Sequence, residues 1–213
     1  MNLILDYGNV LVRWEPERVY TQFFGSEAQS WYFLRHVLTS ELRSRIDAGL
    51  NQDLCLSQLK SQYPDQADAI ELYRSRWDEM LPGEVPGMRH LVAELRQVPG
   101  LQLFGLTNWS METFPAARRR FEVLQMIDRY VVSGDVGLVK PDPAIFRLIL
   151  QRYNLEPAET IFVDDNADNV AAATALGLLG VRFTTADELR QKLATLLPPN
   201  SLKNRGEEGL KRG

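Results

Sequence analysis

Apolar residues follow two different patterns along the chain. Between Pro16 and Pro82 they recur at the three- and four-residue spacing of amphipathic helices, with breaks at Gly25, Gly49 and Pro64. The predicted helices of this segment cover 16–24, 27–38, 40–49 and 51–62, and a further helical stretch runs to Trp77. No stretch here alternates like a strand. An inserted domain made of helices alone is therefore expected.

From Gly87 onward, short apolar runs alternate with amphipathic stretches. The predicted helices cover 88–98, 143–153, 167–177 and 185–197, and the predicted strands cover 101–106, 130–133, 160–163 and 179–183. Gly177 is placed to end one helix and Thr185 to cap the start of another. With the apolar run Leu3 to Leu5, this makes about five strands separated by helices.

Strands that alternate with helices are typical of a parallel sheet covered on both faces. The fold class is therefore α/β, with a Rossmann-like core formed by 1–14 and 83–197 and the helical domain, 15–82, inserted into it. The last residues, 198–213, contain prolines, glycines and mixed charges without apolar periodicity. We expect them to form a flexible tail.

Composition narrows the class of protein. The 213 residues are 45% hydrophobic and carry a net charge of -4, as in an ordinary globular protein without a global reason to bind nucleic acid or an anionic membrane. The single cysteine, Cys55, cannot form an intramolecular disulfide and is interpreted as a packing residue. Without a signal-type segment or an apolar run of ~20 residues, the cytoplasm is the expected location. The protein is expected to be a monomer or a homodimer.

Polar side chains follow three of the predicted strands, and a lysine precedes a predicted helix. The carboxyl ends of parallel strands meet at one edge of a sheet, so these side chains are expected to converge there. They are Asp6 after the first strand, Thr107 and Asn108 after LQLFGL, Asp164 and Asp165 after TIFV, and Lys140 in the loop GLVKPDP, just before a helix that Pro141 or Pro143 can start.

This set of side chains suits phosphate chemistry. Three carboxylates repel one another unless a cation lies among them, and hard oxygen donors suit Mg²⁺. Thr107 and Lys140 offer a neutral donor and a positive charge to phosphoryl oxygens, which leaves Asp6 to attack in line. The implied reaction is transfer of a phosphoryl group to an aspartate, followed by hydrolysis. The implied partner is a small-molecule phosphate ester.

Four segments in this order carry a family resemblance: DYGNVL, LTNWS, GLVKPDPAIF and IFVDDNADN. They resemble the four signature motifs of the haloacid dehalogenase-like hydrolases, and the helical insertion lies where that family carries its cap. The resemblance covers residues 3 to about 197. It is greatest to the phosphatase branch whose first motif reads DxGNV or DxGGV, which includes glucose-1-phosphate phosphatases.

The resemblance implies a role for each motif residue. Asp6 would be the nucleophile and a metal ligand, Gly8 would offer its carbonyl to Mg²⁺, and Asp165 would bind the metal directly, with Asp164 supporting it through water. Thr107 and Lys140 would bind the phosphoryl group, with Lys140 also orienting the carboxylates. Asn108 would contact substrate or phosphate.

Gly8 departs from the commonest pattern of these phosphatases, because many relatives have there an acid that protonates the leaving group. Without that acid, turnover should depend steeply on leaving-group acidity. Anomeric sugar phosphates and acyl phosphates should then be favoured over alkyl phosphates, so the expected substrate is a sugar phosphate. If turnover lacks this dependence, His36 or a residue of the cap is the next candidate for proton donor.

Other residues are weaker candidates for the functional site. Trp14 and Arg13 lie at the junction with the helical insertion, from which a side chain can reach substrate, and Trp109 is a candidate for lining the pocket. Most tryptophans of the insertion, which include Trp31 and Trp77, are expected in its core. The remaining candidates are interpreted as ordinary surface or packing residues: His36, His90, the run 118–120 as a solvated helix face, and Asp168 and Asn169 as polar residues of a helix's first turn.

Two other functions compete with the phosphatase. A 2-haloacid dehalogenase would also use the aspartate but needs no metal, and the pair Asp164 and Asp165 would repel its acidic substrate. A phosphate-sensing receiver module gathers similar residues, but it places the acidic pair first in the chain and lacks a helical insertion. The acidic pair and the motif order favour the phosphatase.

Overall fold

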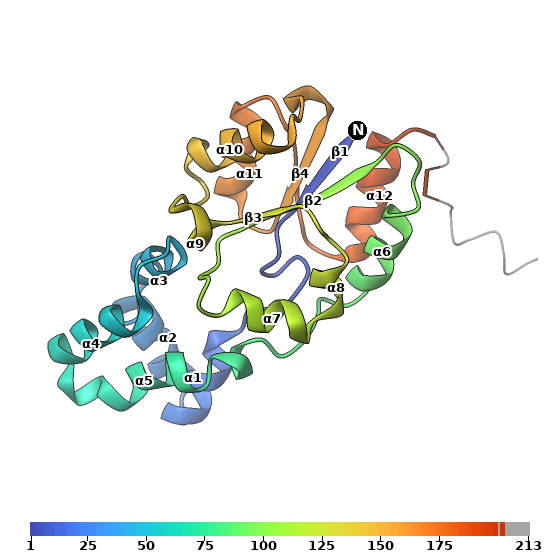
Figure 1. Cartoon of the computed structure of the whole chain (residues 1–213). Helices are drawn as coiled ribbons and strands as arrows, with labels where there is room; N and C mark the ends of the chain where they lie inside the picture. The colour runs from blue at the N-terminus through green and yellow to red at the C-terminus, as the bar shows by residue number, and fades with distance from the viewer. Residues whose placement is uncertain (200, 203–213) are drawn as a thin grey trace, which may run out of the picture.

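The computed structural model describes residues 1–199 and 201–202, and its centre is one parallel sheet (Figure 1). The strands of the described residues are β1 (Asn2–Leu5), β2 (Gln102–Thr107), β3 (Tyr130–Val132), β4 (Thr160–Asp164) and β5 (Leu179–Arg182). Their order in the sheet is β3-β2-β1-β4-β5, so β1 and the residues that follow it lie in the middle. The predicted α/β class with a parallel sheet is confirmed.

Both faces of the sheet are covered by helices, because successive strand residues point to opposite sides. Leu3 and Leu5 pack in one buried cluster with residues of α6 (Met88–Leu95) and α12 (Ala186–Leu196). Ile4 packs in a second cluster with residues of α10 (Pro143–Tyr153) and α11 (Ala167–Ala175). Figure 1 shows these two pairs of helices on opposite sides of the strands.

Between Pro16 and Met80 the regular elements of the chain are all helices, as predicted. This segment contains α1 (Pro16–Phe24), α2 (Glu27–His36), α3 (Ser40–Asp47), α4 (Gln52–Gln62) and α5 (Ala67–Ser75), with the 3-10 helices η1 (Pro64–Gln66) and η2 (Trp77–Met80). Side chains of Ser26, Thr39 and Asn51 accept backbone N–H groups at the starts of α2, α3 and α4. These helices form a lobe beyond the end of the sheet (Figure 1), and we call them the helical block.

Four short elements complete the described chain: α7 (Phe114–Arg120), α8 (Glu122–Gln125), α9 (Ser133–Val136) and η3 (Pro157–Glu159). The last three were not predicted, because one turn is too short to show a periodicity. Ser133, which was predicted to end a strand, begins α9 instead. The roles predicted for Gly177, at φ 89°, and for Thr185, which accepts the N–H of Glu188, agree with the structure.

The packing of Tyr7 against Gly105 sets the direction of the side chains that follow β1. Tyr7 is fully buried, and a Cβ atom on Gly105 would lie 2.3 Å from the Tyr7 hydroxyl oxygen. Only glycine leaves room for this ring beside β2. Because Tyr7 turns into the core, its neighbours Asp6 and Gly8 are left to line a cavity on the other side.

Two sequence predictions concern the C-terminal tail and membrane-spanning segments. Of the predicted tail, 198–213, residues 200 and 203–213 lie outside the described part, whereas Leu202 is buried against the core. In the described part of the chain, no helix is both long enough and apolar enough to cross a membrane.

Candidate active site

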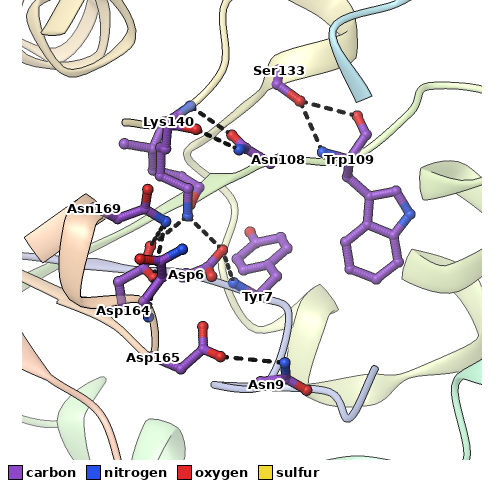
Figure 2. A network of polar contacts seen from close by, with 12 residues as sticks. Asp6, Tyr7, Asn9, Asn108, Trp109, Ser133, Lys140, Asp164, Asp165 and Asn169 are labelled. Atoms are coloured by element: carbon purple, nitrogen blue, oxygen red, sulfur yellow. Dashed lines mark hydrogen bonds and ion pairs between the residues drawn. The ribbon is translucent and has the colours of Figure 1, made fainter. Parts of the chain in front are cut away.

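Lys140 is the centre of a buried polar network at the carboxyl end of the sheet (Figure 2). Its ammonium nitrogen lies 2.8 Å from Oδ1 of Asp6 and 2.7 Å from Oδ2 of Asp164, and it donates to the carbonyl of Leu106 at 2.9 Å. Only 1% of the lysine side chain is exposed. Residues that the sequence places after two different strands therefore meet on one ammonium group.

Asn108 holds the backbone of Lys140. Its Nδ2 donates to the carbonyl of Lys140 at 2.9 Å, and its Oδ1 accepts the Lys140 N–H at 2.8 Å. Both ends of the amide are therefore occupied by the backbone of one residue. These bonds make Asn108 a positioning residue for Lys140. Asn108 also borders the cavity, and the substrate contact expected of it stays a prediction.

Asp164 is fully buried and surrounded by donors. Besides Lys140, it accepts the backbone N–H of Asn166 at 2.8 Å and the Nδ2 of Asn169 at 3.1 and 3.0 Å on its two oxygens. Asn169 was interpreted as a first-turn polar residue, but it is buried, and its place in that turn gave no sign that its side chain points inward. Asp164 thus holds Lys140 and the start of α11 together.

Asp165 is more open, and Asn9 connects it to the chain after β1. The Nδ2 of Asn9 donates to Oδ2 of Asp165 at 3.3 Å, while its Oδ1 accepts the N–H of Trp14 at 2.9 Å. Asn9 has φ 55°, in the left-handed region that asparagine tolerates better than most residues. Sequence reasoning missed Asn9, although an asparagine directly after a glycine is a turn signal.

Burial and mutual repulsion shape the charges of this network. Burial raises the pKa of Asp6 to about 7, with Asp164 and Asp165 adding to the rise and Lys140 opposing it. Burial and the charge of Asp164 also raise the pKa of Asp165. Burial alone would lower the pKa of Lys140, but the carboxylates of Asp6 and Asp164 raise it, so the lysine remains charged.

The three carboxyl groups fit a divalent cation. Asp6, Asp164 and Asp165 each offer an oxygen, and these atoms lie within 4.8 Å of one another. One lysine cannot compensate three carboxylates, and the donors are the hard oxygens that Mg²⁺ prefers. Asp164 already accepts several hydrogen bonds, whereas Asp6, Gly8 and Asp165 border the cavity. The latter three are the groups that would hold the ion.

A cavity of about 220 Å³ lies between this network and the helical block. Its aromatic wall contains Trp14, Trp77, Trp109 and Tyr73; the Trp77 ring lies 5.9 Å from that of Trp14 and 5.8 Å from that of Trp109. The positions expected for Trp14 and Trp109 agree with this wall. Thr107 ends β2 and is buried, with 1% of its surface exposed, and it is not among the residues that line the cavity.

Several weaker sequence interpretations change. Trp31 is 57% exposed and is not a core residue, because it lies on the outer side of α2. Trp77 is buried as expected, but it also lines the cavity. Arg13 pairs with Glu15, outside the residues that line the cavity. In the run 118–120, Arg120 donates to the carbonyl of Asp78 at 2.7 Å, so it also joins α7 to the helical block.

The two histidines and the cysteine agree with their interpretation as surface or packing residues. His36 is exposed, and its ring packs against that of Tyr32 at a tilt of 40°, with ring centroids 4.6 Å apart. His90 lies 2.7 Å from Glu94 on the surface of α6, and Cys55 is buried. Neither histidine lines the cavity.

Comparison with known proteins places these features in a family. The family profile described as haloacid dehalogenase-like hydrolase matches residues 3–177. The sesquiterpene phosphatase astK of Aspergillus oryzae is 31% identical over 88% of this chain and 94% of its own length. The drimenol cyclase drtB of Aspergillus calidoustus is 30% identical over 91% of this chain, which spans only 36% of the cyclase.

A solved structure shares the fold. The magnesium complex of a HAD family enzyme from Bacteroides thetaiotaomicron superposes with a TM-score of 0.70 at 19% identity, covering 90% of this chain and 97% of that enzyme. At this identity the likeness concerns the fold alone.

Proposed function

The chain belongs to the haloacid dehalogenase-like hydrolases, and we propose that it is a Mg²⁺-dependent phosphatase that hydrolyses small phosphate esters through a phosphorylated Asp6. The observation that carries this proposal is the ion pair between Asp6 and Lys140 at the floor of the cavity, beside two further carboxyl groups. The helical block would act as the cap that encloses the substrate.

In the first step, an oxygen of Asp6 attacks phosphorus and the bond to the leaving oxygen breaks. Lys140 holds the attacking carboxylate in place and offsets the negative charge brought by the phosphoryl group. Thr107, at the end of β2, would donate to a phosphoryl oxygen, while Asn108 keeps Lys140 in position. When bound by Asp6, the Gly8 carbonyl and Asp165, Mg²⁺ would neutralise further charge on the phosphoryl oxygens.

In the second step, water attacks the aspartyl phosphate and releases inorganic phosphate. The three carboxyl groups disfavour the dehalogenase alternative, because a dehalogenase needs no metal and nothing would then offset their repulsion of an anionic 2-haloacid. A phosphate-sensing module would have little use for a cavity with an aromatic wall next to the phosphorylated residue.

The cavity wall favours esters with a compact apolar body. Four aromatic side chains present apolar surface, and the 31% identity to a sesquiterpene phosphatase supports the same class of substrate. A sugar phosphate, the substrate expected from the sequence, is the alternative, because C–H faces of sugars also pack on aromatic rings. We propose that the apolar esters are turned over with the higher kcat/KM.

A screen of purified protein tests the proposal. It should contain prenyl, aryl, alkyl and sugar phosphates and a 2-haloacid, each with Mg²⁺ and with excess chelator. We expect release of inorganic phosphate only with Mg²⁺, with prenyl or other apolar phosphates ahead of sugar phosphates. Release of halide in chelator, or no phosphate release from any ester, would contradict the proposal.

A further inference from the structure

The proposed reaction needs a proton for the leaving oxygen, and the residue two positions after Asp6 cannot supply one. Gly8 lines the cavity, and in the described part of the chain no heavy atom beyond Gly8 and its two chain neighbours lies within 4 Å of the place where its Cβ would be. The space that an acid at this position would use is therefore open. Any proton donor must come from another wall of the cavity.

Asp47, the last residue of α3, belongs to the helical block and lines the same cavity as Asp6. The backbone N–H of Ser110, in the loop that follows β2, lies near enough to the Asp47 carboxylate to lower its pKa. The backbone carbonyl of Asp47 accepts the hydroxyl of Ser133 at 2.5 Å, at the start of α9. The backbone of Asp47 is thus bonded to the core, and its side chain lies near the loop that follows β2.

Close backbone contacts keep this end of α3 in place. A Cβ on Gly49 would lie 2.9 Å from the carbonyl oxygen of Gly134. The backbone segments around Gly49 and Gly134 therefore lie closer together than a residue with a side chain would allow. The N–H of Gln52 donates to Oε1 of Glu112 at 2.9 Å. Figure 1 shows α3 beside α9 at this junction. Asp47 is therefore held at a defined position relative to Asp6.

We propose that Asp47 is the general acid of the reaction, supplied by the helical block in place of the side chain that Gly8 lacks. The inference rests on the proposed phosphatase function. As Asp6 attacks and the bond from phosphorus to the ester oxygen breaks, its electron pair stays on that oxygen, which takes the carboxyl proton of Asp47. The resulting Asp47 carboxylate takes a proton from the water that attacks the aspartyl phosphate. The second step thus restores the acid while Asp6 is released.

The surroundings of Asp47 suit this role. Burial raises its pKa to about 7, although the Arg43 guanidinium and the N–H of Ser110 pull it down. Arg43 comes from α3 itself, and Tyr73, from α5, is the titratable group that faces it from the neighbouring helix. A carboxyl group with a pKa near the working pH is half protonated, which is the condition for efficient general acid catalysis.

Other cavity residues serve this role less well. Asp6 and Asp165 are engaged as nucleophile and candidate metal ligand. Arg43 does not release a proton in this pH range, and burial raises the pKa of Tyr73 far above it. His36, which the sequence left as a candidate, is exposed on α2 and does not border the cavity.

Leaving-group dependence tests the proposal. In the parent protein, the logarithm of kcat/KM for aryl and alkyl phosphates should change little with leaving-group pKa. In Asp47→Asn, alkyl phosphates should lose about 10²-fold or more, while a dinitrophenyl phosphate, which needs no proton, should lose less than about tenfold. Asp68→Asn, an exposed carboxyl of the helical block outside the cavity, is the matched control and should keep the shallow plot.

A second variant tests the proposal through recovery of activity. In Asp47→Asn, the further change Gly8→Asp places a carboxyl in the open space beside Asp6 and should restore alkyl phosphate turnover at least tenfold. An equal loss for all leaving groups in Asp47→Asn would overturn the proposal, because it would assign Asp47 to binding or structure. If the parent itself releases no phosphate from any ester, the proposed function fails instead, so the two failures are distinguishable.

Discussion

The ammonium nitrogen of Lys140 lies 2.8 Å from Oδ1 of Asp6, and Oδ2 of Asp164 lies 2.7 Å from it on another side. The lysine therefore joins the nucleophile to the residue that ends β4. Removing a charge that bridges two buried partners should cost both catalysis and stability.

Lys140→Met should lower kcat by about 10²-fold or more, because a preorganised charge at the reacting oxygens is lost. It should also lower the free energy of unfolding by about 3–5 kcal/mol, since two buried carboxyl groups lose their cation. Turnover of an aryl phosphate and urea unfolding measure the two effects. Lys60→Met, which breaks the more exposed pair with Glu71, is the control, at below about 1 kcal/mol. A loss of stability with unchanged kcat would assign Lys140 to structure alone.

Asp6→Asn should abolish turnover and leave the fold intact, because the amide keeps the shape of the side chain but is no nucleophile. Rapid mixing of the parent with an aryl phosphate should give a burst of the released phenol, and the variant should give none. Circular dichroism checks the fold. Turnover within about tenfold of the parent would refute the covalent mechanism, since loss of a nucleophile should add several kcal/mol to the barrier.

Asp165→Ala should raise the Mg²⁺ concentration that half-saturates activity far more than Asp168→Ala does. Asp165 borders the cavity within the three-carboxyl cluster, whereas Asp168 is exposed in the first turn of α11. Titration calorimetry of Mg²⁺ into each protein without substrate gives a readout independent of turnover. Equal affinities in the two variants would remove Asp165 from the proposed ligands.

Asp47→Asn should make stability less dependent on pH. Burial raises the pKa of the folded carboxyl to about 7 from its ordinary value of 3.8, so between these pH values the folded state binds a proton that the unfolded chain has released. The free energy of unfolding therefore falls as pH rises through this window, and the penalty is complete above about pH 7. An asparagine has no such penalty.

Thermal unfolding at pH 5 and pH 8 measures this difference. The melting temperature should fall less between the two values in Asp47→Asn than in the parent, while Asp68→Asn should follow the parent. Asp6 titrates in all three proteins, so only the difference between them reports on Asp47. Parallel falls in the parent and in Asp47→Asn would show that this carboxyl is not buried.

Periodicity predicted the elements best where they are long. The helices at Pro16–Phe24 and Pro143–Tyr153 have the predicted bounds, because each repeats its apolar face over two or more turns and begins with a proline. The one-turn helices α8 and α9 were not predicted, because a segment of one turn is too short to show a helical repeat of apolar residues. The convergence of Asp6, Lys140 and Asp164 was predictable for a related reason, since parallel strands bring their carboxyl ends to one edge.

By itself, the sequence determined the α/β class, the all-helical insertion and which strand ends carry the charged residues, because local spacing and chain order are enough for these. Only the tertiary structure decided that Asn108 holds Lys140, that Asn169 turns inward to Asp164 and that Asp47 lines the same cavity as Asp6. Each depends on the direction of one side chain and on a contact between segments far apart in the chain. No local pattern carries that information, because the partner is set by packing.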